Sequence, residues 1–397
     1  MAKPLEGVRV LDLTRVLAGP FCTMMLSDLG AEIIKVEVPG TGDDSRAFGP
    51  FRNEQSLYFV NVNRGKKSIA IDLKTNGGKK LLKELAAVSD VIVENFRPGT
   101  MEKLGLGWDV LKEVNPRLIY AAVSGFGHSG PDSGRPAYDI LVQAMGGVMS
   151  ITGWPELPPT RVGLSMGDLT AAIYCAVGIN AALYQRTVSG KGQKVDVSML
   201  DCQLSILENA LVRYQVDGHS PEPLGTRHPT ITPFQAFHAN DHWFVVAVGN
   251  DALWKKFCDA SGRKDLFDDA RFVTNSDRTR HLNELIPELE NMFAKNSRSY
   301  WLELLEKAGV PSAPVNTVED VMKDRQLAAR NMFVTVEDEK AGKIIIPGNP
   351  IKMESIPESP VRAPAPHIGQ HGEEILKKLL SKTEEEISSL KSDGVIV

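Results

Sequence analysis

Apolar positions in the first third of the chain follow two alternating spacings. Short runs rich in Val and Ile, typical of buried strands, alternate with segments whose apolar residues recur at helical spacing. The predicted strands are GVRVLDLT (7–14), AEIIKVEVP (31–39), KSIAIDL (67–73), DVIVENF (90–96) and RLIYAAVSGFG (117–127). The predicted helices are GPFCTMMLSDLG (19–30), NGGKKLLKELAAVS (76–89) and GLGWDVLKEVNP (105–116). This alternation predicts βαβ units and a parallel sheet covered on both faces, with right-handed crossovers.

The pattern turns helical from Tyr138 to about Glu208, with a strand-like segment, KVDVSM (194–199), inserted. Segments of this kind still suit an α/β layer structure, in which helices cover the faces of a sheet. We therefore assign residues 1–224 to one large α/β domain.

After Pro221 the pattern changes again. PFQAFHANDHWFVVAVGND (233–251) predicts two strands joined by a turn, and helical segments follow. Residues 225–320 are therefore predicted to form a second, smaller α+β domain. Residues 321–397 are predicted to hold a linker, a hairpin, an extended proline-rich segment and one or two charged amphipathic helices. The segments behind these predictions are DALWKKFCDAS (251–261), RSYWLELLEKAG (298–309), MFVTVEDEKAGKIIIPGNPIKM (332–353), PESPVRAPAPHIGQHG (357–372) and EEILKKLLSKTEEEISSLKSDG (373–394).

Composition narrows the class of protein. The chain has 397 residues, a net charge of -5 and a pI near 6.0, which argues against a nucleic-acid-binding protein with a basic face. Its N-terminus carries no signal-peptide pattern, and its apolar stretches fall short of the ~20 residues that span a bilayer. These features predict a cytoplasmic protein that binds no membrane. Four widely spaced cysteines without a CxxC pair fit reduced, mostly buried thiols: Cys22, Cys175, Cys202 and Cys258.

Familiar sequence motifs exclude several kinds of site. No GxGxxG follows a strand, and GxxxxGK[ST], HExxH and GxSxG are absent. His238 and His242 flank the predicted hairpin turn instead of sharing a helix face, and His367 and His371 lie in a glycine- and proline-rich segment. No metal site is therefore predicted. Local patterns alone indicate an α/β protein, most simply an enzyme.

Longer stretches, read together, resemble the family III CoA-transferases, a group that includes formyl-CoA and carnitine CoA-transferases and the alpha-methylacyl-CoA racemases. The resemblance runs in order over nearly the whole chain. It rests on GVRVLDLTRVLAGPFCTMMLSDLGAEIIKVE (7–37), NRGKKSIAIDLK (63–74), DVIVENFRPGTMEKLGLG (90–107), LIYAAVSGFGHSGP (118–131), PAYDILVQAMGG (136–147), GDLTAAIYCA (167–176), GKGQKVDVSMLD (190–201), HPTITPFQAF (228–237), NDALWKKFC (250–258) and GVPSAPVNT (309–317).

The resemblance implies a fold that composition and periodicity do not reveal. In this family two chains interlock as a homodimer. A Rossmann-like large domain is built from both ends of each chain, and a smaller domain lies between them. The predicted segment 225–320 fits the smaller domain, and 321–397 would complete the large one.

Asp168 is open to two interpretations. By itself, an Asp ahead of an apolar helix is most often an N-cap. The resemblance places Asp168, in GDLTAA, at the family's nucleophile position. A carboxylate there would attack a thioester to give an acyl anhydride, which CoA thiolate would convert into an enzyme-bound thioester. The helix N-terminus is expected to keep this carboxylate ionised.

The resemblance also places a CoA site and no tightly bound cofactor. CoA needs cationic side chains for its phosphates and backbone groups for its pantetheine and adenine. For the cationic residues the alternative is a solvated surface charge, and for the apolar ones it is the core. By family position the residues that bind CoA are Val16, Ala18, Ile71, Asp72, Leu73, Lys74, Asn95, Phe96, Arg97, Lys103, Ala137 and Asp139.

Two departures from the family pattern bear on the reaction. Tyr138 stands where the racemases have a proton-transferring histidine, and a tyrosine, with an ordinary pKa of about 10, is a poor base at neutral pH. We expect Tyr138 to bond the reacting carbonyl, or else to pack. Leu17 replaces a glutamine of formyl-CoA transferase, which argues against oxalate–formate exchange. Arg15 and Arg46 could each grip the second carboxylate of a dicarboxylic acid, or be structural.

The sequence therefore predicts a CoA-transferase that moves CoA from an acyl-CoA, such as succinyl-CoA or another dicarboxylyl-CoA, to an organic acid. Its predicted partners are these substrates and a second copy of the chain. The alternatives are an acyl-CoA racemase or epimerase, and a non-catalytic CoA-binding subunit in which Asp168 only caps its helix.

Overall fold

The computed structural model describes residues 3–397, which divide into two compact units. The first, called the large unit, combines both ends of the chain: Met1–Val148, Arg161–Val212 and Arg325–Val397. The second, called the small unit, comprises Met149–Thr160 and Arg213–Asp324. The predicted domain limits at residues 224 and 320 stay predictions.

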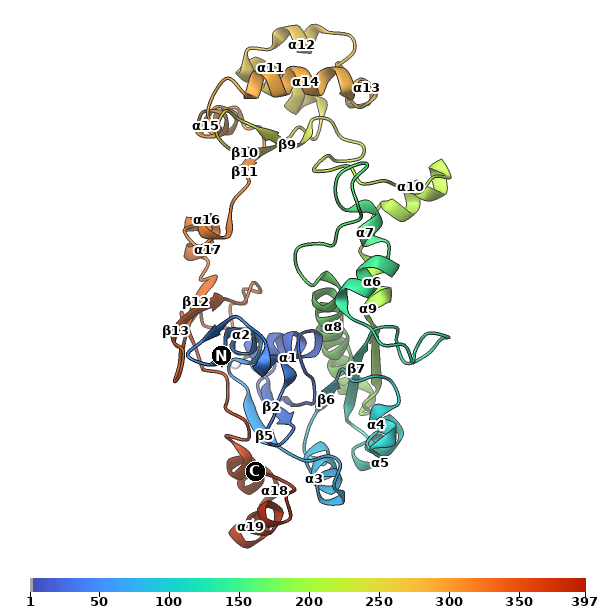
Figure 1. Cartoon of the computed structure of the whole chain (residues 1–397), viewed down its shortest axis with the longest axis vertical. Coiled ribbons are helices and arrows are strands. Elements are labelled where there is room, and N and C mark those ends of the chain that lie inside the picture. The colour runs from blue at the N-terminus through green and yellow to red at the C-terminus, as the bar shows by residue number, and fades with distance from the viewer. Residues whose placement is uncertain (1–2) are drawn as a thin grey trace. The chain divides into compact units, whose positions relative to one another are not determined.

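A six-stranded sheet forms the centre of the large unit (Figure 1). Its strands are β1 (Arg9–Asp12), β2 (Glu32–Glu37), β5 (Lys67–Ala70), β6 (Val91–Glu94), β7 (Ile119–Ser124) and β8 (Lys194–Ser198). They lie in the order β5-β2-β1-β6-β7-β8, and every neighbouring pair is parallel. The predicted parallel sheet is confirmed. The strand order reverses between β1 and β6, which creates a topological switch point where ligands of open α/β sheets bind.

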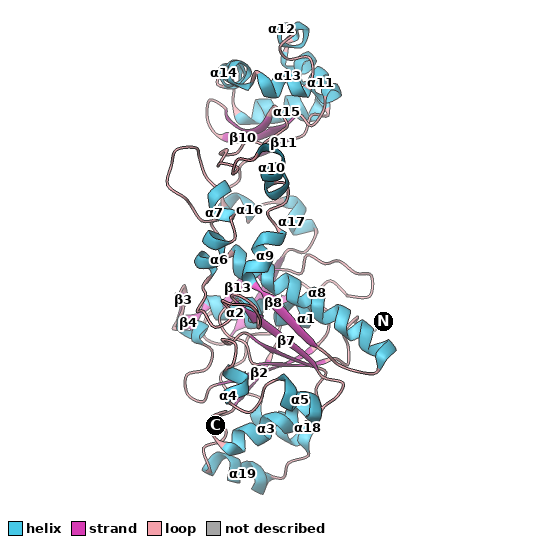
Figure 2. Ribbon diagram, turned by 90° about the vertical axis from the view of Figure 1, so that its right-hand side faces the viewer, coloured by secondary structure: helices cyan, strands magenta, loops and turns pink. Residues whose placement is uncertain are grey.

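Helices cover both faces of this sheet (Figure 2). On one face, residues such as Val10 and Val93 pack with α1 (Ala18–Asp28) and α8 (Met166–Ser189). On the other face, their neighbours Leu11 and Ile92 pack with helices from distant parts of the chain. These helices are α3 (Asn76–Ala87), α5 (Trp108–Val114), α18 (Gly372–Leu380) and α19 (Glu384–Ser392). The central strands β1, β6 and β7 are thus apolar on both sides, as expected for a doubly covered parallel sheet.

The large unit holds further short elements around the sheet. A small sheet of β12 (Phe333–Asp338), β13 (Gly342–Pro347) and β14 (Val361–Arg362) shares a core with α2 (Leu57–Asn63). The predicted hairpin over 332–353 is confirmed by β12 and β13. The remaining elements are η1 (Asp44–Ala47), β3 (Phe51–Arg52), β4 (Gln55–Ser56), α4 (Thr100–Lys103), α6 (Asp139–Met145), α9 (Met199–Ser205) and α17 (Arg325–Ala329), while α7 (Val148–Ile151) and α10 (Ala210–Asp217) cross the boundaries between the units.

The small unit is an α+β structure with its own aromatic-rich core. Its antiparallel sheet, in the order β11-β10-β9, contains the predicted hairpin, β9 (Phe234–His238) and β10 (Trp243–Ala247), and β11 (Ser312–Pro314). The predicted helices over 251–261 and 298–309 are confirmed by α11 and α15. The helices are α11 (Asp251–Ser261), α12 (Lys264–Asp268), α13 (Asn275–Arg280), α14 (Leu282–Phe293), α15 (Arg298–Ala308) and α16 (Val318–Val321).

Two sequence predictions need correction. Residues 152–165 form a loop, although the segment from Tyr138 onwards was expected to be helical. The loop contains Pro155, Pro158 and Pro159, which lack the backbone N–H that a helix requires. In addition, α2 was not predicted, because its sequence LYFVNVN places apolar residues at spacings that also suit a strand.

Two predictions made from composition, one on the cysteines and one on membrane-spanning segments, can be compared with the structure. All four cysteines are free and buried, as predicted. Within residues 3–397 one helix, α8, is by length and composition alone apolar enough to cross a bilayer, and its Ala171, Cys175 and Ile179 lie in the core of the large unit.

Candidate active site

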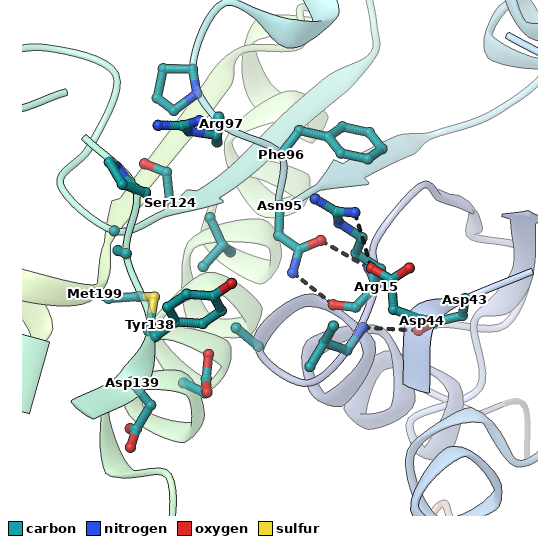
Figure 3. A pocket seen from close by; sticks show the side chains of 18 of the residues that line it. Arg15, Asp43, Asp44, Asn95, Phe96, Arg97, Ser124, Tyr138, Asp139 and Met199 are labelled. Carbon is teal, nitrogen blue, oxygen red and sulfur yellow. Dashed lines mark hydrogen bonds and ion pairs between the residues drawn. The ribbon is translucent and has the colours of Figure 1, made fainter. Parts of the chain in front are cut away.

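A cavity of about 790 Å³ opens beside the switch point of the parallel sheet, within the large unit. Its walls come from the loops that follow β1, β6 and β7, from the segment around η1, and from the first residues of α6 and α8 (Figure 3). The volume suits a ligand of cofactor size. Ten residues predicted from the resemblance line this one cavity: Arg15, Val16, Ala18, Asn95, Phe96, Arg97, Ala137, Tyr138, Asp139 and Asp168.

Asp168 is not the N-cap of its helix. The N-cap of α8 is Ser165, and Asp168 is the third helical residue, so the capping interpretation is wrong in its simple form. The half-buried carboxylate lines the cavity, and no hydrogen bond or ion pair to it occurs among residues 3–397. A carboxylate that stabilises a helix end would normally accept a backbone N–H, and this one does not.

The electrostatics around Asp168 also differ from expectation. Burial, followed by the nearby charge of Asp139, raises the pKa of Asp168 to about 7. This direction runs against the expectation that the helix N-terminus keeps the carboxylate ionised, because burial and a like charge both favour its protonated form. Tyr58, on α2, lies in the same field: burial and then the charge of Asp168 raise its pKa to about 12.

The loop between β1 and α1 is held in a strained conformation. Val16 has a φ of 67°, a value that β-branched residues avoid. Its N–H donates to Asp43 Oδ1 at 3.0 Å, and Arg15 exchanges two backbone bonds with the side chain of Asn95, at 2.9 and 2.8 Å (Figure 3). Such strain persists only where the surroundings fix the backbone, and it is concentrated at functional sites.

A buried ionic network lies behind this loop. Asp12, at the end of β1, bonds Thr14 and pairs with Lys66 Nζ at 2.9 Å. Lys35 pairs with Asp43 at 2.8 Å and donates to the carbonyl of Thr14 at 2.8 Å. The pKa of Asp12 is held far below its usual range because these cations and hydroxyl donors outweigh its burial. The network fixes the backbone on which Val16 stands.

The loop after β6 is anchored by a buried acid. Glu94 accepts the N–H of Phe96 at 2.8 Å and the hydroxyl of Tyr120 at 3.2 Å. Burial raises the pKa of Glu94 to about 7. Residues 95–97 are therefore held at the edge of the cavity, which all three line.

Comparison with known proteins gives the chain its family. The profile of CoA-transferase family III matches residues 5–372. An acetyl-CoA:oxalate CoA-transferase of Acetobacter aceti is 45% identical over 94% of this chain and 95% of that protein. A succinyl-CoA:glutarate CoA-transferase of Mus musculus is 41% identical over 99% of this chain and 90% of that protein.

A solved structure supports the same family. A CAIB/BAIF family protein from Brucella suis superposes with a TM-score of 0.84 at 38% identity, covering 96% of this chain and all of that one. This chain belongs to CoA-transferase family III. The predicted enzyme class is confirmed: the protein is a CoA-transferase, and its substrates are CoA thioesters.

The mouth of this CoA-transferase's cavity carries three arginines, Arg15, Arg97 and Arg135. Arg15 pairs with the exposed Asp44 at 3.0 Å and lies over the ring of Phe96, 5.8 Å from its centroid. Arg97 makes only a long contact, 3.4 Å, with the carbonyl of Gly134. A guanidinium with spare donors suits a phosphate or carboxylate.

Other predicted residues lie outside the cavity. Ile71 is buried in the second core, and residues 72–74 follow it beyond the end of β5. Lys103 ends α4, and Leu17 is the N-cap of α1. These residues flank the cavity's edge of the sheet without lining the cavity.

Arg46 is fully engaged elsewhere. Its guanidinium donates to both carboxylate oxygens of Glu37, at 2.8 and 2.7 Å, and to the carbonyl of Pro366. It also lies over Phe59, 3.7 Å from the ring centroid. This geometry favours the structural alternative for Arg46.

Sequence reasoning missed several residues of the site. Some line the cavity, and others hold its walls in place. For Asp12, Glu94 and Ser124 the ends of the predicted strands could have served as a signal, since the carboxyl ends of parallel strands meet at one edge. The missed residues are Asp12, Lys35, Asp43, Asp44, Tyr58, Lys66, Glu94, Ser124, Arg135 and Met199.

Proposed function

We propose that this CoA-transferase moves CoA from succinyl-CoA, or another dicarboxylyl-CoA, to a dicarboxylic acid, with Asp168 as the nucleophile. The observation that carries the proposal is a half-buried carboxylate, with no ion pair or hydrogen bond to it among residues 3–397, at the wall of a cavity of about 790 Å³. The two similar enzymes named above act on glutarate and oxalate, both dicarboxylic acids.

The reaction needs no redox step and no net proton transfer. Ionised Asp168 attacks the thioester carbonyl of the donor, the C–S bond breaks, and an anhydride forms as CoA thiolate leaves. The thiolate then attacks the Asp168 carbonyl and releases the donor acid, leaving an Asp168–CoA thioester. The acceptor carboxylate repeats the two steps in reverse, and Asp168 is regenerated.

A raised pKa suits this role. A carboxylate with a pKa near 7 is a stronger nucleophile, once ionised, than one with an ordinary pKa, and about half of it is ionised at neutral pH. Tyr138 is our candidate for a hydrogen bond to the reacting carbonyl. It is the N-cap of α6, its side chain is 76% exposed, and it lines the cavity (Figure 3).

CoA would lie along the carboxyl edge of the sheet. Phe96 offers a ring for the adenine, and Arg97 and Lys103 offer charge for the phosphates. Residues 71–74 follow β5, three strands and about 14 Å from β6 at ordinary strand spacing, so an extended ligand could reach both segments. The remaining proposed contacts are Val16, Ala18, Asn95 and Ala137.

Arg15 is our candidate for the second carboxylate of the substrate, with Leu17 beside it. Its present partner, Asp44, is exposed, so a substrate carboxylate can replace it at little cost. Arg46 would have to break a bidentate pair with Glu37 to play that part.

We also propose the interlocked homodimer of the family, with a Rossmann-like large domain and a cytoplasmic location. The outer face of α8 supports a second copy of the chain. Ile173, Val177, Tyr184 and Val188 follow one another at helical spacing and are between 46% and 80% exposed. Apolar faces of this kind usually mark protein contacts.

The decisive experiment pairs donor and acceptor panels with mass spectrometry. Acetyl-CoA and succinyl-CoA are each offered with oxalate, glutarate and a monocarboxylic acid, and the enzyme is quenched during turnover. We expect product only with dicarboxylic acceptors and a CoA adduct on the peptide that contains Asp168. Exchange of the α-hydrogen in deuterated water without CoA transfer would instead indicate a racemase, and CoA binding without any turnover would indicate a non-catalytic subunit.

A further inference from the structure

Asp139, predicted above to bind CoA, has its carboxylate turned toward protein. Oδ1 accepts the backbone N–H of Gly167 at 2.8 Å. Oδ2 accepts from the side-chain amide of Gln143 at 2.8 Å, and Arg161 lies 3.8 Å away. Gly167 is the second residue of α8 and directly precedes Asp168.

The tight packing around Gly167 shows that this contact requires a glycine at position 167. A Cβ added at Gly167 would meet Val142 Cγ2 at 2.6 Å and Asp139 Oδ1 at 3.1 Å. Only glycine lets the first turn of α8 approach α6 this closely. The bond also joins residues 28 positions apart, so it ties two helix N-termini together at the wall of the cavity.

We propose that Asp139 is the positioning residue for the nucleophile: its carboxylate holds the first turn of α8 through the Gly167 N–H and sets the charge that Asp168 faces. This inference rests on the proposed function, because it assumes that Asp168 reacts. It departs from the family position, which gives Asp139 to CoA. Gln143 and Arg161 hold the carboxylate from the other side and prevent its rotation toward a ligand.

Asp168 faces charged and titratable groups from every neighbouring element. Asp139 is the nearest like charge, and its removal should favour ionisation of Asp168. The others are Tyr138 on α6, Tyr58 on α2, Arg161 beside Asp139, and, around the cavity, Arg15, Asp43, Asp44, Arg97 and Arg135. A charge-removing change at position 139 also frees Arg161 from its 3.8 Å pair with Asp139 and takes away one of the charges that raise the pKa of Tyr58.

The test compares two substitutions at one position. Asp139→Asn keeps an oxygen that can accept the Gly167 N–H but loses the charge, so we expect kcat within a fewfold of wild type. The midpoint of its kcat/KM–pH profile should move to lower pH from the value near 7 in the wild type. Asp139→Ala loses both the hydrogen bond to Gly167 and the charge. The first turn of α8 should then be displaced, and kcat should fall by roughly 10²-fold. KM for the acyl-CoA should change little in either.

Two further variants guard the interpretation. Gly167→Ala disturbs the same bond without changing any charge, so it should lower kcat and leave the pH midpoint in place. Asp201→Asn is the matched control: it removes an exposed carboxylate from the first turn of α9 and should move neither quantity. Circular dichroism and melting temperature confirm folding of each protein.

The possible outcomes distinguish a failure of the inference about Asp139 from a failure of the proposed function. An unmoved pH midpoint in Asp139→Asn with a raised KM for the acyl-CoA would return Asp139 to CoA binding and overturn the inference. A fully active Asp168→Asn would remove the proposed function itself. An inactive Asp168→Asn beside an unshifted Asp139→Asn would sink the inference alone.

Discussion

Two aspartates of the large unit, Asp12 and Asp168, have pKa values that are shifted in opposite directions. Asp12 is wholly buried, yet Lys66, Lys35 and two hydroxyls surround it, so its pKa is held far below the usual range. Asp168 is only half buried, but it has no ion-pair partner among residues 3–397 and lies near the like charge of Asp139, and its pKa rises to about 7.

The difference shows that burial alone does not tell a structural carboxylate from a reactive one. Burial opposes ionisation at both sites, and the partners decide the outcome. The paired acid stabilises the loop that carries Val16, whereas the unpaired acid keeps a reactive oxygen at a cost in stability. This is the pattern expected when an active site is tuned against stability.

The largest effect should come from Asp168. Asp168→Ala removes the carboxylate proposed to form the anhydride, and turnover should fall by at least ~10³-fold. Steady-state rates with succinyl-CoA check this, and CoA binding by calorimetry should stay within a fewfold of wild type. Turnover near the wild-type rate would show that Asp168 does not react.

The same substitution should leave the fold intact, and the contrast with Asp12 gives the control. Asp12→Ala leaves Lys66 in the interior without its ion-pair partner, so this variant should have a far lower free energy of unfolding than Asp168→Ala at the same pH. Equal losses of stability in the two variants would contradict the distinction between the two acids.

The next effect is on stability and concerns Lys66. Its Nζ bonds Asp12, Thr23, Asn63 and the carbonyl of Pro20, all within 3.1 Å. Lys66→Met leaves the carboxylate of Asp12 buried with a weaker counter-charge, and we expect a loss of about 3 kcal/mol in the free energy of unfolding. Urea unfolding at pH 7 measures it.

A double variant sharpens this prediction. Adding Asp12→Asn to Lys66→Met removes the unpaired charge and should restore part of the loss. Lys67→Met is the matched control, because the ion pairs that Lys67 makes with Glu32 and Glu374 are partly exposed and weak. A loss below ~1 kcal/mol in Lys66→Met would show that the buried pair contributes little.

The contrast between Lys66 and Lys67 also shows where sequence reasoning ends. The parallel sheet and most of its helices followed from local apolar spacing, because the central strands β1, β6 and β7 are apolar on both faces. Nothing local tells which lysine of RGKKS enters the core. That depends on Asp12, which lies 54 residues away.

The candidate site was predictable only in part, and for the same reason. Ten of its residues came from the resemblance, whereas Asp43 and Arg135 carry no local signal. The link between Asp139 and Gly167 spans two helices separated by the loop 152–165, which was itself expected to be helical. Contacts between distant segments, which decide the chemistry here, leave no trace in local periodicity.

A smaller effect concerns pH. The folded-state pKa of Asp168 is raised from 3.8 to about 7, so the folded chain keeps a proton that the unfolded chain releases. Its contribution to stability is fully present below pH ~4 and is lost as the pH rises through 7. Asp168→Asn should therefore gain on the wild type between pH 5 and 8, by ~2 kcal/mol once solvent exposure is allowed for.

Urea unfolding of both proteins at pH 5, 6, 7 and 8 measures this gain. The advantage of the variant must grow with pH and level off above the pKa. For Asp12→Asn the difference from wild type should stay constant over this pH range, since a lowered pKa favours the ionised acid and its contribution is lost only in strong acid. A constant difference between wild type and Asp168→Asn would contradict the raised pKa.

The smallest effect on stability should come from Val16. Its side chain lines the cavity together with Asp168, and the ionic network around Asp12 fixes its backbone. Val16→Gly relieves backbone strain at a φ of 67°, which stabilises the folded state. Glycine also raises the conformational entropy of the unfolded chain, which lowers stability, and these effects of about 1 kcal/mol each oppose one another. We expect a change below ~1 kcal/mol in the free energy of unfolding. KM for the acyl-CoA should rise severalfold, because the side chain lines the cavity. Glu54→Gly, at a φ of 62° on an exposed turn, should match its stability change and leave KM alone. An unchanged KM in Val16→Gly would remove Val16 from the CoA site.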